Sequence, residues 1–230
     1  MVCPVMRPVQ RLSLAVLLLV TAVAPAALAT ISDSADDSIR QFLAQDDAQP
    51  AYRAERRLEA ETGSRHGWMQ AVTSYSPQTG FRYEVTAEGG SGFIRNRVLR
   101  AVLDGEREVI EKGETTRSSI ALDNYTFQVN GVDDNGLVTV LLTPRRQERV
   151  LVAGSMTLRP REGDLVCLRG RLAKNPSFWT KNVDIVRHYK RIAGSILPVE
   201  LESKAQLRPF GTAALHMTYR YLEINGRPID

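Results

Sequence analysis

The second half of the chain alternates apolar and polar residues in long runs. Between positions 195 and 207, Leu197, Val199, Leu201, Ala205 and Leu207 occupy alternate positions, and polar or charged residues stand between most of them. Four further stretches between positions 149 and 221 show the same pattern. Strict alternation is typical of strands with one wet face and one dry face. The pattern therefore predicts five consecutive strands between positions 149 and 224.

Two more pairs of strands are expected before this region. Residues 68–76 and 81–87 flank a Ser-Pro-Gln-Thr-Gly turn, and residues 124–129 and 136–143 flank an Asp-Asp-Asn-Gly turn. Proline, asparagine and glycine at such places are typical of β-hairpins. The sequence thus predicts nine strands in all, with neighbours in the chain close enough to pair antiparallel.

The clearest helical pattern lies between these two hairpins. Residues 93–112 carry an apolar stripe at helical spacing, and Gly113 follows as a C-cap. A shorter helix is expected at 115–122. Near the N-terminus, residues 34–43 and 52–61 are interpreted as two helical pieces, both charged and only weakly amphipathic.

These elements predict one fold. A twisted sheet of about nine strands tends to curl, and the stripe of residues 93–112 must pack on an apolar surface, which the dry face of the sheet provides. We therefore predict an α+β fold, in which a curled antiparallel β-sheet (a half-barrel) has helices packed on its concave apolar face. A closed barrel is the alternative architecture.

The N-terminus has the three-part layout of a secretory signal peptide. Arg7 and Arg11 precede an apolar run at 12–23 that is too short to span a membrane, and the small residues Ala27 and Ala29 follow. We predict cleavage after Ala29, so that residues 1–29 are the signal peptide. Residues 30–230 then form a single half-barrel domain in the periplasm or outside the cell. An uncleaved anchor is the alternative interpretation.

Charge and cysteine content narrow the class of protein further. The formal net charge is +4, and loss of Arg7 and Arg11 lowers it to +2, which argues against nucleic-acid binding. Cys3 leaves with the predicted signal peptide, so Cys167 has no partner for an internal disulfide. We expect Cys167 to be a buried thiol within a strand. The mature protein is expected to be soluble, with no membrane-spanning segment.

The order of elements is similar to that of the bacterial lipoprotein-carrier superfamily, whose members include LolA, LolB and the sigma-factor regulator RseB. The shared features are a cleaved leader, an N-terminal helix, a hairpin, a central helical insertion and a long antiparallel meander. The resemblance covers most of the chain after residue 29. It implies a half-barrel plugged by helices, with apolar space between sheet and helices that accepts acyl chains.

Three shorter segments resemble a group of secreted bacterial proteins for which no activity is established. The first segment, residues 83–106, includes Glu88-Gly89-Gly90-Ser91; the others are residues 124–127 and 170–179. This second resemblance implies nothing specific about function.

No arrangement of residues in the sequence predicts catalysis or metal binding. His66, His188 and His216 have no other histidine or cysteine at metal-ligand spacing. Ser91 lies between glycines, but Phe93 stands where a Gly-x-Ser-x-Gly elbow needs its second glycine. A helix N-cap is therefore the expected role of Ser91. We predict that the protein is not an enzyme and uses no cofactor or metal.

Two aromatic residues, Phe178 and Trp179, follow Pro176 at the start of a predicted strand. In one interpretation the two rings, which have lysines nearby, form the lip of an apolar pocket. In the other, Trp179 is a core residue in line with Val183 and Ile185.

Two functions fit these patterns. The first is a periplasmic binding protein that holds an apolar ligand, a lipid or a lipoprotein acyl chain, between the dry face of the sheet and the central helix. The second is an envelope protein-protein interaction or regulatory module whose half-barrel is filled by its own helices. For the first function, Val199 is left unassigned, and the predicted ligand-binding residues are Ile94, Val98, Val102, Phe178, Trp179, Leu201, Leu215, Met217 and Tyr219.

Overall fold

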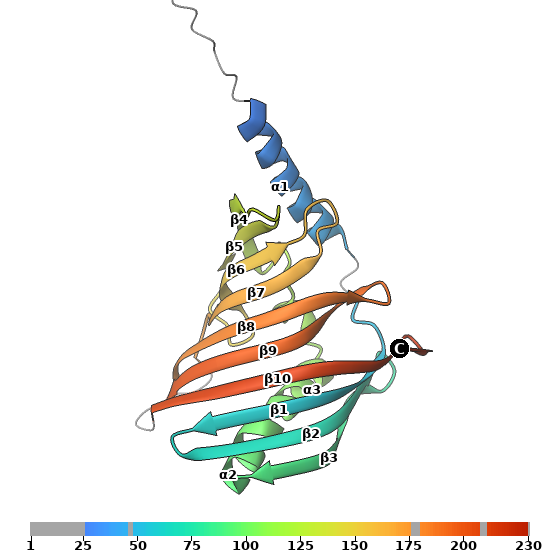
Figure 1. The fold of residues 1–230 in the computed structure, drawn as a ribbon, viewed down its shortest axis with the longest axis vertical. Helices are drawn as coiled ribbons and strands as arrows, with labels where there is room; N and C mark the ends of the chain where they lie inside the picture. Colours follow the sequence, from blue (N-terminus) through green and yellow to red (C-terminus); the bar gives the residue numbers. More distant parts are fainter. Residues whose placement is uncertain (1–25, 46–47, 176–179, 208–210, 230) are drawn as a thin grey trace, which may run out of the picture.

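The structure is a computed structural model that describes residues 26–45, 48–175, 180–207 and 211–229, with side chains from Ala35 onward. Within these ranges, eleven strands form one curled antiparallel sheet with helices on its concave side (Figure 1). The strands are β1 (Tyr52–Thr62), β2 (Arg65–Ser76), β3 (Gly80–Gly90), β4 (Tyr125–Val132), β5 (Val138–Pro144), β6 (Val152–Leu158), β7 (Leu165–Leu172), β8 (Thr180–Ile192), β9 (Ser195–Leu207), β10 (Gly211–Ile224) and β11 (Arg227–Pro228). The helical elements are α1 (Ala26–Ala44), α2 (Gly92–Ile94), the π-helical turn η1 (Arg95–Leu99), α3 (Arg100–Glu111) and α4 (Thr115–Ser118).

The sheet is an open half-barrel. Its strand order is β3-β2-β1-β10-β9-β8-β7-β6-β5-β4, and β11 pairs with β10. Because β3 and β4 are unpaired edges at opposite ends of this order, the sheet does not close. The predicted fold class is confirmed, and all nine predicted strands are present.

The predicted helix at residues 52–61 is wrong, because these residues form β1. This strand lies between β2 and β10, so it joins the first hairpin to the long meander. Its buried residues alternate from Tyr52 to Ala60, and Arg56 is one of them. A charged residue on the dry face hides the alternation that marks a strand. β1 and the short β11 are the two strands that the sequence analysis missed.

One row of interior side chains crosses nine strands in register. Residues paired directly across antiparallel strands point to the same face, so the row follows from the pairing of each strand with the next. Every member is buried or half-buried, and the predicted dry face is therefore continuous. The row runs from β4 to β2 through Val129, Val140, Met156, Leu168, Arg187, Leu201, Met217, Leu58 and Met69.

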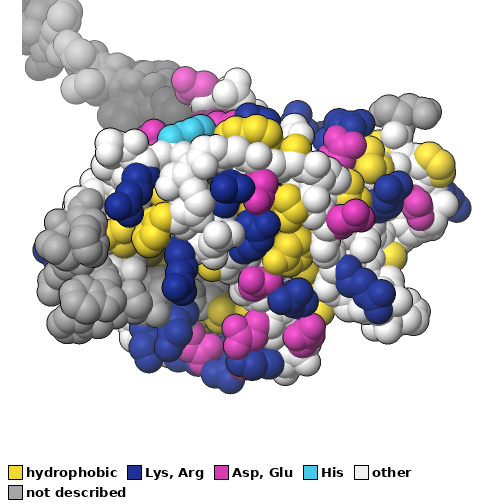
Figure 2. Space-filling model, turned by 90° about the horizontal axis from the view of Figure 1, so that it is seen from below, with side chains coloured by type: hydrophobic (Ala, Val, Ile, Leu, Met, Phe, Trp, Pro, Cys, Tyr) yellow, Lys and Arg dark blue, Asp and Glu magenta, His cyan; other side chains and the backbone are white. Residues whose placement is uncertain are grey.

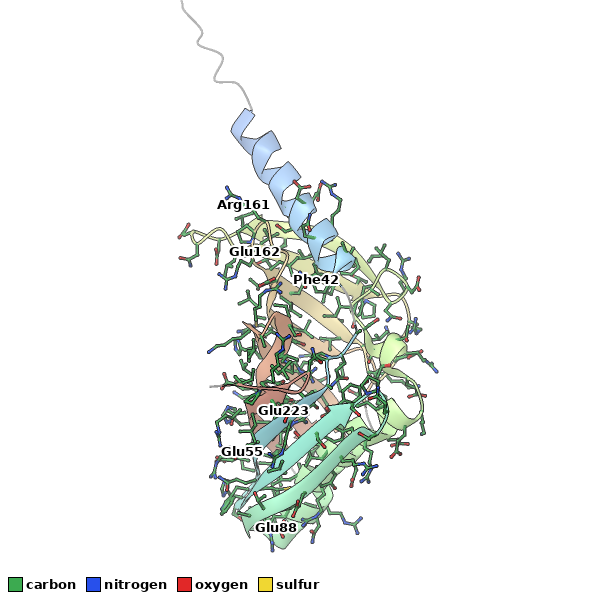
Figure 3. All side chains as sticks on the ribbon, turned by 90° about the vertical axis from the view of Figure 1, so that its right-hand side faces the viewer. Phe42, Glu55, Glu88, Arg161, Glu162 and Glu223 are labelled. Carbon is green, nitrogen blue, oxygen red and sulfur yellow. The ribbon has the colours of Figure 1, made fainter. Side chains whose placement is uncertain are left out.

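The N-terminal helix α1 covers the β4–β7 end of the concave face. Its described side chains Ala35, Ile39 and Phe42 pack into the hydrophobic core of that end. Figure 3 shows Phe42 close to the turn between β6 and β7. In that turn a Cβ added to Gly163 would lie 2.4 Å from the backbone nitrogen of Phe42, so only glycine allows this approach.

The helical insertion α2–η1–α3 covers the other end, on β1, β2 and β3. Ile94, Leu99 and Leu103 are completely buried there. Gly113 ends the insertion as predicted, because its φ of +65° lets the nitrogens of Gly113 and Glu114 bond the last helical carbonyls.

Two details of the predicted helices need correction. Ser91 does occupy the N-cap position, but its side chain makes no capping hydrogen bond. The helix expected at 115–122 is shorter, because only Thr115–Ser118 are helical. The buried Asn124 donates hydrogen bonds to the carbonyls of Thr116 and Ser119, both 2.8 Å long, and so holds the following loop in a non-helical path.

Candidate ligand-binding interior

The middle of the concave face lies between the two helix-covered ends. The insertion makes its main contacts with β1, β2 and β3, and α1 with β4 and β6. Ile185 of β8 packs against both of the resulting hydrophobic cores. We call the region around it the central interior, and it comprises Ile185, Arg187, Tyr189, Leu201, Leu215 and Tyr219.

One buried ion pair ties the insertion to the sheet beside the central interior. Arg56 of β1, 3% exposed, donates to both carboxylate oxygens of Glu106 on α3, at 2.5 and 2.9 Å. It also donates to the hydroxyl of Tyr52 at 2.7 Å. Its guanidinium lies 5.1 Å from the ring centre of Phe81 and 4.7 Å from that of Tyr219. Such stacking on aromatic faces is favourable for a desolvated arginine.

The charges of this pair stabilise each other. Burial alone raises the pKa of Glu106, but the charge and hydrogen bonds of Arg56 outweigh burial and bring that pKa below its ordinary value. Burial lowers the pKa of Arg56, and Glu106 more than compensates. Burial raises the pKa values of Tyr52 and Tyr219. Both phenols are therefore neutral near pH 7 and are able to donate hydrogen bonds.

Arg187 is a second arginine on the same interior face, and its surroundings differ. Among the described residues no carboxylate forms an ion pair with it, and its buried Nε has no hydrogen-bond partner. Its strongest interaction is with Tyr189, which raises the pKa of Arg187 although burial lowers it. Tyr219 and Glu106 act on it more weakly. Arg187 therefore stays a cation inside the protein.

Arg187 and Tyr219 are both half-buried on the concave face. Each keeps some accessible surface beside the buried Leu201 and Met217. The two side chains therefore differ from the completely buried residues under the insertion.

Seven of the predicted ligand-binding residues lie in one hydrophobic core. Three come from the insertion and four from β9 and β10, so helix and sheet face each other as expected. Ile94, Leu201 and Met217 are buried, while Val98, Val102, Leu215 and Tyr219 are half-buried. Their role in binding stays a prediction. Phe178 and Trp179 lie outside the described residues, and the unassigned Val199 is half-buried on β9.

Three charged residues of this interior were not predicted from the sequence: Arg56, Glu106 and Arg187. A signal for Arg187 exists, because Val183, Ile185 and Tyr189 alternate around it and place position 187 on the same face. The sequence gives no signal that Arg56 pairs with Glu106, because 50 residues separate them in the chain.

The residues examined for catalysis or metal binding lie mainly on the outer face. Cys167 and His188 pair with each other one position from Leu168 and Arg187, so they point away from the interior. Cys167 is consequently half-buried rather than buried as expected. His216 lies 2.8 Å from the carboxylate of Glu200. Among the described residues, no group of histidine, cysteine, aspartate and glutamate is arranged to hold a metal.

None of the helices in the described part of the chain combines the length and the apolar character that a membrane crossing requires.

Comparisons with known proteins give similarities of fold. No protein-family model and no curated protein matches the chain. A DUF1329 family protein from Desulfovibrio piger is similar with a TM-score of 0.36 and 8% identity, over 83% of this chain and 91% of that one. A LolA superfamily protein from Nitrosomonas europaea is similar with a TM-score of 0.38 and 9% identity, over 86% of this chain and 95% of that one.

Proposed function

We propose that this protein is a non-enzymatic periplasmic binding protein that holds an apolar ligand, such as a lipid or a lipoprotein acyl chain, in the central interior. The observation that supports the proposal is the accessible surface that Tyr219 keeps on the concave face, beside a row that crosses nine strands and is apolar except for Arg187. Apolar concave space with a few polar groups is typical of small-molecule sites.

The distribution of packing supports the same proposal. The half-buried Val98 and Val102 of the insertion and Leu215 of β10 belong to one core without being fully covered. Seen from the β3 end, hydrophobic side chains reach the surface between charged ones (Figure 2). An acyl chain in the central interior would cover apolar surface that the protein leaves accessible, at roughly 25 cal/mol per Å² buried.

The test is lipid uptake by the purified protein after removal of bound lipid. Native mass spectrometry is expected to show acyl lipids on gently purified wild type and their return when lipid is added. Leu215→Trp, which fills the interior, should weaken uptake several-fold. Leu141→Trp is the matched control, because Leu141 is exposed on the outer face of β5 and should leave uptake unchanged.

Circular dichroism of both variants checks that each is folded. A folded wild-type protein that takes up no acyl lipid or other amphiphile would contradict the proposal. Equal loss of uptake in the two variants would also contradict it, because the outer face would then matter as much as the interior.

One observation favours the second candidate function, an interaction or regulatory module filled by its own helices. The insertion leaves no accessible surface at Ile94, Leu99 and Leu103, so these three residues are fully packed against the sheet. That function predicts capture of an envelope protein at the same strength from lipid-free and lipid-loaded samples. Capture that changes with lipid loading would argue against it.

A further inference from the structure

The central interior carries a positive charge that the protein itself does not balance. Arg56 and Glu106 form a direct pair and neutralise each other. Arg187 is then left with one positive charge, and Glu106, already engaged by Arg56, is the carboxylate that acts on it. Arg187 is half-buried, and a charge that is partly removed from water is more favourable when an opposite charge pairs with it.

The surroundings of Arg187 are apolar on both sides along the sheet. Its register neighbours are Leu168 on β7 and Leu201 on β9, and Ile185 precedes it on the same face. It is the charged member of a row that is otherwise apolar over nine strands. Because the neighbours of Arg187 along this row are apolar, the row suits a ligand that is itself mostly apolar.

Hydrogen-bond donors for an anion are also present. The Nε of Arg187 is buried and unused. Tyr189 and Tyr219 both lie close enough to Arg187 to interact with it electrostatically, and a tyrosine hydroxyl can donate one hydrogen bond. A carboxylate placed among these groups would accept charge-assisted hydrogen bonds, which are the strong class.

Resting on the proposed function, we propose that the ligand is an anionic amphiphile with a single negative head group. The head group binds Arg187, with Tyr189 and Tyr219 as further donors, and the hydrocarbon chain lies against the half-buried Leu215. The head charge balances the charge of Arg187, so the loaded interior is neutral. A long-chain carboxylate is the simplest ligand of this class.

The experiment compares oleate with its methyl ester, which has the same chain and no charge. Both are titrated into delipidated wild type, Arg187→Met and Arg187→Lys, with binding followed by displacement of a fluorescent apolar probe. Wild type is expected to bind oleate roughly 10- to 100-fold more tightly than the ester, the range for one charge-assisted interaction. Arg187→Met should bind the two equally, and Arg187→Lys should keep part of the preference.

Arg169→Met is the matched control. Arg169 is exposed on the outer face of β7, one residue from Leu168, and its loss should leave the preference for oleate unchanged. Sodium acetate and sodium chloride test whether an anion without a chain is sufficient. Neither should displace the apolar probe or raise the thermal midpoint as oleate does.

The outcomes separate this inference from the proposed function. Equal binding of oleate and ester by wild type would overturn the anionic head group and leave the apolar carrier intact. Failure to bind either would overturn both. Stabilisation by acetate or chloride equal to that by oleate would show a simple anion site and overturn the amphiphile. If Arg187→Met does not fold, the preference for oleate is compared between Arg187→Lys and wild type. Lysine keeps the charge but not the planar fork, so a partial preference supports the inference and an unchanged preference contradicts it.

Discussion

Arg56 and Arg187 place the same side chain on the same concave face in two different settings. Arg56 lies where the insertion covers β1, and it has a carboxylate, a phenol and two aromatic rings around it. Arg187 lies on β8, between the two helix-covered ends, and no carboxylate pairs with it among the described residues. The first arginine fastens a helix to the sheet, whereas the second has no ion-pair partner among the described residues.

The two arginines mark two parts of the half-barrel that differ in how completely their side chains are buried. The β1–β3 end is close-packed, since Leu58, Met69 and Leu103 have no accessible surface. The middle keeps accessible surface on Arg187 and Tyr219. A rigid end that anchors the insertion and a less filled middle together suit a protein that holds a guest without rebuilding its sheet.

The largest effect is expected from Glu106→Gln, which leaves Arg56 buried without a negative partner. The free energy of unfolding should fall by roughly 3 kcal/mol, the lower end of the range for breaking a buried pair, because the Glu106 side chain keeps 30% exposure. Urea unfolding followed by circular dichroism measures it.

The control for this prediction is Glu108→Gln on the same helix, whose exposed pair with Lys112 should not contribute measurably. Replacing both partners, as Arg56→Met with Glu106→Leu, should restore much of the loss because no charge then remains unpaired. A double variant as unstable as Glu106→Gln would contradict the inference that the loss comes from leaving Arg56 unpaired. The contrast between Arg56 and Arg187 would then be smaller than we infer.

A smaller loss is expected from Gly67→Ala, which tests how tightly the insertion lies on β2. A Cβ at position 67 would stand 2.9 Å from two side-chain carbons of Ile94. The crowding should lower the free energy of unfolding by about 1–3 kcal/mol. Gly105→Ala is the control with opposite sign, since no atom lies within 4 Å of its added Cβ. It should stabilise the helix by about 0.5–1 kcal/mol. Equal results for the two glycines would mean that the insertion is not close-packed.

The smallest and finest test is the pH dependence of the Arg56–Glu106 pair. The pKa of Glu106 is lowered in the folded protein, so its contribution is complete above its unfolded pKa of about 4.3 and is lost as pH falls through the folded value. The stability difference between wild type and Glu106→Gln should therefore be constant from pH 7 to about 5 and shrink in more acidic solution. Chemical denaturation at several pH values measures it, and a difference that grows below pH 4 would contradict the pairing.

Particular residues show how far the sequence could go. The alternation around Leu201 and Met217 is regular, so the strands, their dry face and the half-barrel were all predictable. The helical stripe around Val98 and Val102 likewise predicted the insertion and its packing on that face. β1 was not predicted because the charged Arg56 occupies an interior position, where alternation would place an apolar residue. The local pattern of residues gives no sign that Glu106 neutralises Arg56. Arg187 was not predicted as an interior residue for the same reason: it occupies an inward position in the alternating series of β8, but it is charged.

The sequence by itself determined the strands, the apolar face and the helix that covers part of it, because these follow from the local spacing of apolar residues. Only the tertiary structure decided which charges lie inside and which of them are paired. That outcome depends on contacts between residues far apart in the chain: β1 pairs with β10, Glu106 pairs with Arg56, and Arg187 has no ion-pair partner among the described residues. Whether a charge in the interior is paired depends on which side chains the folded structure brings together, so it cannot be predicted from one stretch of sequence.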